Sequence, residues 1–170
     1  MSTASATSAD RLTEAALVDT IRRLVERESP SSDDAAVARS ADLVAEIGRA
    51  LLRAEPERIV VDGCSHLRWH FGPETRVLLL AHHDTVWPTG TLGRLPFGVD
   101  DGVLRGPGSF DMKAGLAMAF HALAALDDRD GVTLLVTGDE EIGSARSREL
   151  IESTAQGAAA VLVLEASADG

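Results

Sequence analysis

The sequence contains only one cysteine, Cys64, and this scarcity excludes several kinds of site. A single thiol cannot form a disulfide within the chain. Without a neighbouring thiol it also cannot form a CxxC zinc site or a redox pair. We therefore interpret Cys64 as a buried structural residue.

Long apolar segments are absent as well. No apolar stretch reaches the roughly 18 residues that a transmembrane helix needs. Residues 1–10 are small and polar and contain no hydrophobic signal-peptide core, so we expect them to form a disordered tail. These absences predict a cytoplasmic protein with no membrane partner.

Positive charge is scarce: 16 Lys and Arg residues face 27 Asp and Glu residues, and the formal net charge is −11. Such a charge repels phosphates, so we expect no nucleic-acid partner. Most of the excess is typical of a solvated acidic surface. Some of these carboxylates are available to bind divalent cations, which would neutralise them.

The 170 residues, 45% of them hydrophobic, are enough for one domain with a core. Apolar spacing predicts helices at 13–27 and 33–53, separated by Ser29-Pro30-Ser31. Asp101-Gly102 predicts a hairpin turn. Three apolar runs are typical of strands buried on both faces of a parallel sheet. The alternation of elements favours an α/β sandwich with a mostly parallel central sheet. The predicted strands are 58–61, 67–71, 76–81, 132–137 and 159–164, the last three being the apolar runs, and further helices are expected at 113–126 and 144–153.

Polar residues with metal-binding groups follow the three apolar runs. His82, His83 and Asp84 follow the first run, Glu140-Glu141 lie just beyond the second, and Glu165 follows the third. Ligands of open α/β sheets bind beyond the carboxyl ends of the strands, so we expect these side chains to gather at one edge. Such a set of ligands favours a two-metal hydrolase.

The spacing of His82, His83 and Asp84 separates their roles. Alternate residues of an extended chain point the same way, so His82 and Asp84 share a side and His83 faces the other. A metal-bound histidine usually has a carboxylate partner that orients it. A histidine at the end of a strand is more often structural, but Asp84 and the other acids favour His82 as a ligand. The remaining histidines lack such company and are interpreted as structural: His66, His70 and His121.

The acids Asp111 and Glu140-Glu141 allow a structural and a functional interpretation. Asp111 stands where a loop opens a helix, and such a residue is commonly an N-cap. The alternative is a carboxylate placed between two cations. Glu140 and Glu141 are adjacent and cannot share one direction. One can therefore bind metal while the other takes a proton from metal-bound water.

Three segments together resemble the metallohydrolases of peptidase family M20: HHDTV at 82–86, GPGSFDMKAG at 106–115 and DEEIGS at 139–144. The pattern is similar to the glutamate carboxypeptidase and aminoacylase branches. This resemblance implies a zinc-peptidase-like α/β/α sandwich, with residues 11–170 as the N-terminal part of the catalytic domain. It also implies cleavage of an amide bond in a small peptide or an N-acyl amino acid.

The resemblance implies roles for the matched positions. His82 and Glu165 would bind one zinc ion, with Asp84 orienting His82. Asp111 would bridge to a second zinc ion, bound also by Glu141, and the peptide bond after this aspartate would be cis. Glu140 would be the general base. Cobalt or manganese also suits histidine and carboxylate ligands.

The family also has a further zinc-binding histidine and a lid domain that supplies dimer contacts, and these are not found up to Gly170. We therefore expect a truncated catalytic domain without its lid, an exposed apolar sheet edge and little activity in the isolated chain. The full-length parent is expected to be a homodimer. One alternative is a non-catalytic split half that binds metal weakly and needs its C-terminal half. A nucleotide-binding domain is disfavoured, because neither GxGxxG nor a Walker lysine pattern is present.

Overall fold

The computed structural model describes residues 13–167, so the tail expected at residues 1–10 lies outside the described part of the chain. The two predicted N-terminal helices are present as α1 (Glu14–Glu26) and α2 (Asp34–Leu52). Thr13 caps α1 and Asp33 caps α2, each accepting a hydrogen bond from a backbone N–H three residues later. Local capping chemistry therefore sets where both helices begin.

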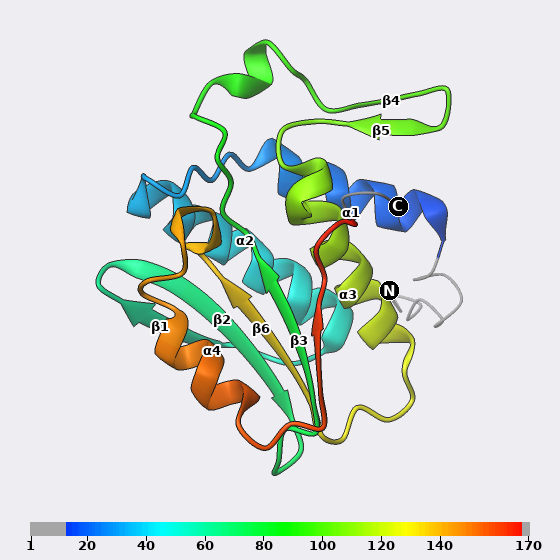
Figure 1. The fold of residues 1–170 in the computed structure, drawn as a ribbon. Helices are drawn as coiled ribbons and strands as arrows, with labels where there is room; N and C mark the ends of the chain where they lie inside the picture. Colours follow the sequence, from blue (N-terminus) through cyan, green and yellow to red (C-terminus); the bar gives the residue numbers. More distant parts are fainter. Residues whose placement is uncertain (1–12, 168–170) are drawn as a thin grey trace, which may run out of the picture.

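The central sheet has five strands in the order β1-β2-β6-β3-β7. The two pairings of β3, with β6 and with β7, are parallel, whereas β1 and β2 are antiparallel to their neighbours. Figure 1 shows α1, α2 and α3 on one face of this sheet and α4 on the other, so the predicted α/β sandwich is confirmed, but the sheet is mixed and not mostly parallel as predicted. The strands are β1 (Glu57–Val61), β2 (Cys64–Phe71), β3 (Val77–His82), β6 (Val132–Thr137) and β7 (Ala160–Val163), and the later helices are α3 (Ala114–Ala125) and α4 (Arg148–Ala155).

The core lies between the sheet and the layer formed by α1, α2 and α3. Trp69 of β2 meets Phe120 of α3 edge to face, with ring centroids 5.3 Å apart. Both side chains are buried. The alternation predicted for this strand is also confirmed, because Leu67 and Trp69 point into the core while His70 is exposed.

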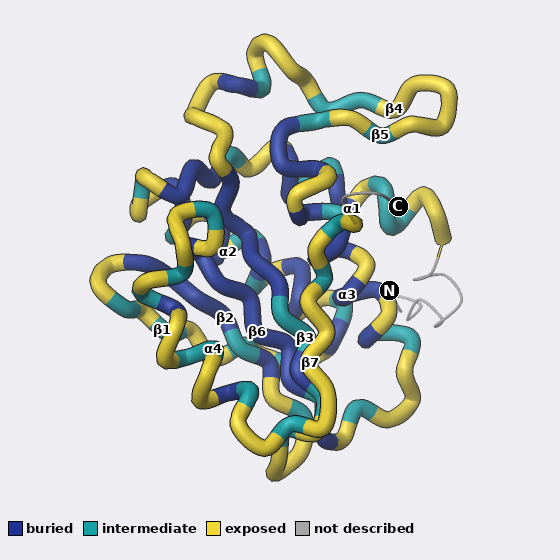
Figure 2. The backbone as a smooth tube through the Cα atoms, in the orientation of Figure 1, coloured by how far each residue is buried: buried dark blue, intermediate teal, exposed yellow. Residues whose placement is uncertain are grey.

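The prediction that β7 is buried on both faces is wrong. Val161, Leu162 and Val163 are 43%, 51% and 57% exposed. Figure 2 shows the strand at the rim of the sheet, and within residues 13–167 no element covers it. This apolar strand is therefore the exposed sheet edge that was expected from the sequence.

Two loop regions carry further detail. Asp101-Gly102 forms the predicted hairpin turn between β4 (Gly98–Asp100) and β5 (Val103–Arg105). Helix α4 begins at Arg148, later than the predicted Ser144, because Ser144 has a positive φ of 54° and residues 145–147 form a turn. The Asp139 carboxylate holds this loop by accepting hydrogen bonds from the Arg146 and Ser147 N–H groups.

Across residues 13–167, no helix is both long and apolar enough to cross a membrane.

Candidate metal centre

The carboxyl ends of β3, β6 and β7 lie at one edge of the sheet. His82 is the last residue of β3 and pairs with Thr137 of β6, while Leu80 pairs with Val163 of β7. Because the three strands are parallel, the segments that follow them emerge side by side. This topology brings Glu140-Glu141 and Glu165 to the end of the strand that carries His82.

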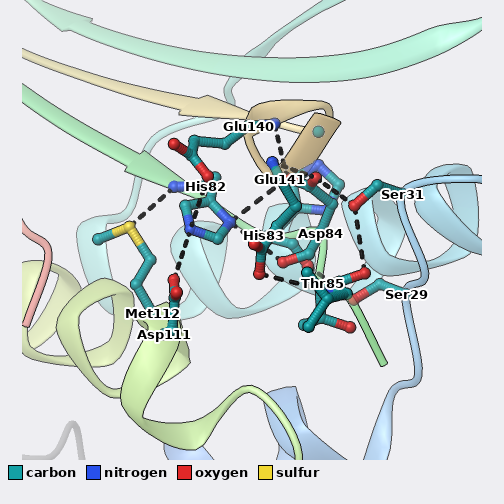
Figure 3. A network of polar contacts seen from close by, with 12 residues as sticks. Ser29, Ser31, His82, His83, Asp84, Thr85, Asp111, Met112, Glu140 and Glu141 are labelled. Carbon is teal, nitrogen blue, oxygen red and sulfur yellow. Dashed lines mark hydrogen bonds and ion pairs between the residues drawn. The ribbon is translucent and has the colours of Figure 1, made fainter. Parts of the chain in front are cut away.

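The buried His82 imidazole lies at the base of this site, below the more exposed carboxylates. Its Nε2 lies 3.1 Å from Asp111 Oδ1, 3.2 Å from Glu165 Oε1 and 3.8 Å from Glu140 Oε2. The His82 side chain is 1% exposed, whereas the three carboxylates are between 36% and 56% exposed. Figure 3 shows Asp111 and Glu140 approaching the ring from different elements. We call His82, Asp111 and Glu165 the open cluster.

Asp84 lies on the opposite edge of the same ring. His82 Nδ1 is 3.3 Å from Asp84 Oδ1 and 3.1 Å from the Asp84 backbone oxygen. The same carboxylate accepts hydrogen bonds from the N–H groups of Glu140 and Glu141, each at 3.3 Å. As the extended spacing predicts, Asp84 therefore shares a side with His82, and it also contacts the turn that follows β6.

Asp111 caps no helix, so the N-cap interpretation is wrong. Its backbone is non-helical, with φ −118° and ψ 100°, and the cap position of α3 is Lys113, which makes no side-chain cap. The peptide bond between Asp111 and Met112 is cis. The Met112 sulfur accepts a hydrogen bond from the His82 N–H at 3.2 Å. This contact places the Asp111 carboxylate beside the imidazole.

Glu141 stands apart from the open cluster. Its Oε1 accepts a hydrogen bond from the Val86 N–H at 3.3 Å. Burial and the nearby Asp111 carboxylate raise the pKa of Glu141. In residues 13–167, Glu141 belongs to no group of three ligand atoms within 4.8 Å of one another. Among the described residues, a second cation bound by Asp111 and Glu141 would therefore have no third close ligand.

Electrostatics favour a positive charge at the centre of the open cluster. Burial of His82 disfavours its charged form, but Asp84 and the surrounding carboxylates outweigh this effect and raise the pKa of His82 to about 9. Burial likewise opposes ionisation of Asp84, yet hydrogen bonds with His82 and Ser31 hold its pKa below the usual value. Burial raises the pKa of Glu165. A proton or a metal ion at Nε2 would supply the favoured charge.

The open cluster also fits a metal ion geometrically. Its three ligand atoms all lie within 4.8 Å of one another. Ligands about 2.0 Å from a tetrahedral zinc ion lie about 3.3 Å from each other. The separations of 3.1 and 3.2 Å around Nε2 are close to that value.

His83 points away from the site, as its position next to His82 predicts. It contacts the Ser40 hydroxyl and the Ser65 carbonyl, and burial lowers its pKa to about 4. Two other histidines also make contacts away from the open cluster. His70 contacts Thr133, and His121 contacts Thr20.

A second group of ligand-type residues was missed from the sequence: Cys64, His66 and Asp139, which we call the sealed cluster. All three are fully buried. The Gly138 N–H donates to His66 Nδ1 at 3.2 Å, so Nε2 of the neutral ring carries the proton and has no lone pair for a metal. Burial raises the pKa of Cys64 to about 12. The i, i+2 spacing of Cys64 and His66 was the available signal.

Comparison with known proteins agrees with this arrangement. The model of peptidase family M20/M25/M40 matches residues 78–168. Carboxypeptidase G2 from Pseudomonas sp. (strain RS-16) is 32% identical over 166 residues, which cover 91% of this chain and 40% of that protein. Succinyl-diaminopimelate desuccinylase from Anaplasma marginale (strain Florida) is 46% identical over 63 residues, or 35% of this chain and 16% of that enzyme.

The fold also resembles solved structures. The M20 family metallo-carboxypeptidase Sso-CP2 from Sulfolobus solfataricus superposes with a TM-score of 0.73 at 20% identity, over 89% of this chain and 37% of that one. This chain thus spans about two fifths of the length of carboxypeptidase G2 and of Sso-CP2. Since the family model covers more than half of its residues, the chain belongs to peptidase family M20/M25/M40.

Proposed function

We propose that this chain supplies the metal-binding part of a zinc-dependent hydrolase that cleaves amide bonds. The observation that carries the proposal is the convergence of three carboxylates on His82 Nε2 at the carboxyl end of the sheet. In this proposal residues 11–170 are the N-terminal part of the catalytic domain. The matched part is 40% of carboxypeptidase G2, which supports the view that these residues are part of a larger protein.

The proposed ligands divide between two cations. His82, Asp111 and Glu165 would hold the first, and Asp111 with Glu141 would hold the second. Histidine nitrogen and carboxylate oxygen suit zinc, and they also suit cobalt or manganese. A bound cation would polarise the amide carbonyl and lower the pKa of a coordinated water.

Glu140 is the proposed general base. Its Oε2 lies 3.8 Å from His82 Nε2, farther than either proposed ligand oxygen, and its side chain is 48% exposed. It is therefore near the cation site without being needed as a ligand. Such a carboxylate can accept a proton from the attacking water and return it to the leaving amine. The Asp84 contact with its N–H group holds the backbone of this residue.

The proposed substrate is a small peptide cleaved at its C-terminal residue or an N-acyl amino acid. The likeness to a carboxypeptidase supports the first and the likeness to a desuccinylase supports the second. Both substrates present an amide bond beside a free carboxylate. A cytoplasmic location and a homodimeric parent protein stay predictions.

A split half that binds metal and needs a separate C-terminal partner is the second candidate. The observation that favours it concerns the second cation site: within residues 13–167, Asp111 and Glu141 have no third ligand atom close to them. The two candidates share the chemistry of the first cation site. They differ in whether the missing ligand comes from the same polypeptide.

Hydrolysis assays with dipeptides and N-acyl amino acids, with and without zinc, test the proposal. We expect turnover when the chain is combined with the residues that correspond to the unmatched part of its relatives, in the same polypeptide or as a second chain. The 170-residue chain alone should show little turnover. Glu140→Gln should lower kcat about 10²–10⁴-fold, as expected for loss of a general base. Zinc affinity should change little, which distinguishes a base from a ligand.

Full activity of Glu140→Gln would contradict the role of Glu140. Rapid zinc-dependent turnover by the isolated chain would contradict the need for further residues. Failure of the chain to bind any divalent cation would contradict the whole proposal.

A further inference from the structure

The segment between α1 and α2 docks onto the residues that follow β3. Residues 29–31, which we call the docking segment, form a parallel bridge between Pro30 and Thr85. The Thr85 N–H donates to the Ser29 oxygen at 2.8 Å, and the Ser31 N–H donates to the Thr85 oxygen at 3.1 Å. Although the sequence predicts only a helix break here, the segment is paired as if it extended the sheet.

The two hydroxyls of the docking segment have different targets. The Ser29 hydroxyl donates to the His83 backbone oxygen at 2.7 Å, and the Ser31 hydroxyl lies 2.6 Å from Asp84 Oδ2. Ser31 Oγ is also 3.1 Å from the Thr85 oxygen. A hydroxyl has one proton to donate, and the shorter contact to a charged carboxylate is favoured. Ser31 therefore binds the side chain of Asp84, whereas Ser29 binds only backbone.

Asp84 joins the two halves of the candidate site. Its Oδ1 lies 3.3 Å from His82 Nδ1 and accepts from the Glu140 N–H, and its Oδ2 accepts from the Glu141 N–H. These contacts are all 3.3 Å long, so each is weak by itself. The Ser31 contact is 0.7 Å shorter, since it measures 2.6 Å. Figure 3 shows this chain of contacts from Ser31 through Asp84 to His82 and the glutamate turn.

We propose that Ser31 is a positioning residue that sets the rotation of the Asp84 carboxylate. In one orientation, that carboxylate aligns the His82 imidazole and also holds the turn carrying Glu140 and Glu141. The inference rests on the proposed function, in which His82 is a ligand and Glu140 the base. Without the Ser31 hydroxyl, the Asp84 carboxylate would keep only the three longer contacts within residues 13–167, so its rotation would be less restricted.

The matched pair Ser31→Ala and Ser29→Ala tests this role. Both variants remove one buried hydroxyl from the docking segment, but only the first removes a contact with Asp84. Zinc affinity of the chain is measured by competition with a chelating dye. We expect Ser31→Ala to weaken zinc binding by about tenfold, the low end for groups that support a metal ligand, and Ser29→Ala by less than about twofold.

Amide hydrogen exchange of the metal-free chain provides a second readout. Ser31→Ala should speed exchange at the Glu140 and Glu141 amides, while exchange within β6 stays unchanged. A merely structural role would instead speed exchange across the sheet, and to a similar extent in both variants. Equal behaviour of the two variants in both measurements would overturn the inference. If the unmodified chain binds no zinc, the proposed function fails, and the exchange pattern still decides whether Ser31 positions Asp84.

Discussion

The open cluster and the sealed cluster contain similar residue types but differ in what they can bind. Each offers three ligand atoms within 4.8 Å of one another, including one buried histidine. In the open cluster the carboxylates Asp111 and Glu165 are partly exposed, at 56% and 36%. In the sealed cluster Cys64 and Asp139 are fully buried. Proximity of ligand atoms is therefore not enough to define a metal site.

The decisive difference lies at the second nitrogen of each imidazole. His82 Nδ1 faces oxygen acceptors on Asp84, so it holds a proton and leaves Nε2 for a cation. His66 Nδ1 faces the Gly138 N–H, a donor, so the proton of the neutral ring is on Nε2. A backbone group thus determines which histidine is competent to bind metal. Three predictions test this contrast, in order of decreasing effect.

Reactivity of Cys64 should show the largest effect, because the sealed cluster is closed to solvent. At about pH 8 we expect a thiol reagent to label the folded chain at least about 10³-fold more slowly than the unfolded chain, since labelling requires opening of the core. Burial raises the thiol pKa from 9.0 to about 12. The resulting stabilisation is present below pH 9 and is lost as the pH rises towards 12.

Labelling kinetics, followed with and without denaturant and with and without zinc, check this prediction. Zinc at the open cluster should slow labelling only as far as it stabilises the fold. Rapid labelling of the folded chain, or direct protection by a stoichiometric metal at Cys64, would show that the second cluster is not sealed.

Substitution of the two histidines compares the clusters directly. His82→Gln should weaken zinc binding by at least about 100-fold, because it removes a ligand rather than a supporting group. His66→Gln should leave zinc affinity within about twofold while lowering the free energy of unfolding. Zinc titration and urea unfolding of both variants measure the two effects. If His66→Gln lost as much zinc affinity as His82→Gln, the claim that only the open cluster binds metal would be wrong.

Two glycines should separate packing from positioning. A Cβ at Gly138 would lie 2.6 Å from the Ser65 backbone oxygen, so Gly138→Ala should cost about 1–3 kcal/mol of stability. A Cβ at Gly115 would lie 2.3 Å from the Leu164 backbone oxygen, next to Glu165. Because β7 is an exposed edge strand that can shift, Gly115→Ala should act mainly on zinc affinity, by about tenfold.

Gly93→Ala is the control, because nothing lies within 4 Å of a Cβ built there. Urea unfolding and zinc titration should leave this variant unchanged. A Gly115→Ala variant with unaltered zinc binding would mean that the position of Glu165 does not depend on its contact with α3.

Features set by neighbouring residues were predictable from the sequence. The helices predicted at 13–27 and 33–53 and the hairpin turn Asp101-Gly102 follow from apolar spacing and turn chemistry within short stretches of the chain. The opposite directions of His82 and His83 follow from the alternation of an extended chain. These predictions needed no knowledge of distant contacts.

Other features depended on distant parts of the chain. The run at β7 has the composition of a buried strand, but its position at the edge of the sheet leaves it exposed. Asp111 has the sequence position of an N-cap, but α3 begins only at Ala114, and the Asp111 carboxylate lies beside His82 instead. Local patterns contain no information about strand order or about which distant group meets a side chain.

The residue types of the open cluster, the places of His82 and Glu165 at strand ends and the motifs of the family could all be predicted from the sequence. Parallel strands bring such residues to one edge, so the chemistry was visible in the order of motifs. Three contacts could be seen only in the folded chain: Ser31 with Asp84, the Gly138 N–H with His66, and Cys64 with Asp139. These contacts join segments far apart in the chain, and their hydrogen-bond directions depend on how the segments pack.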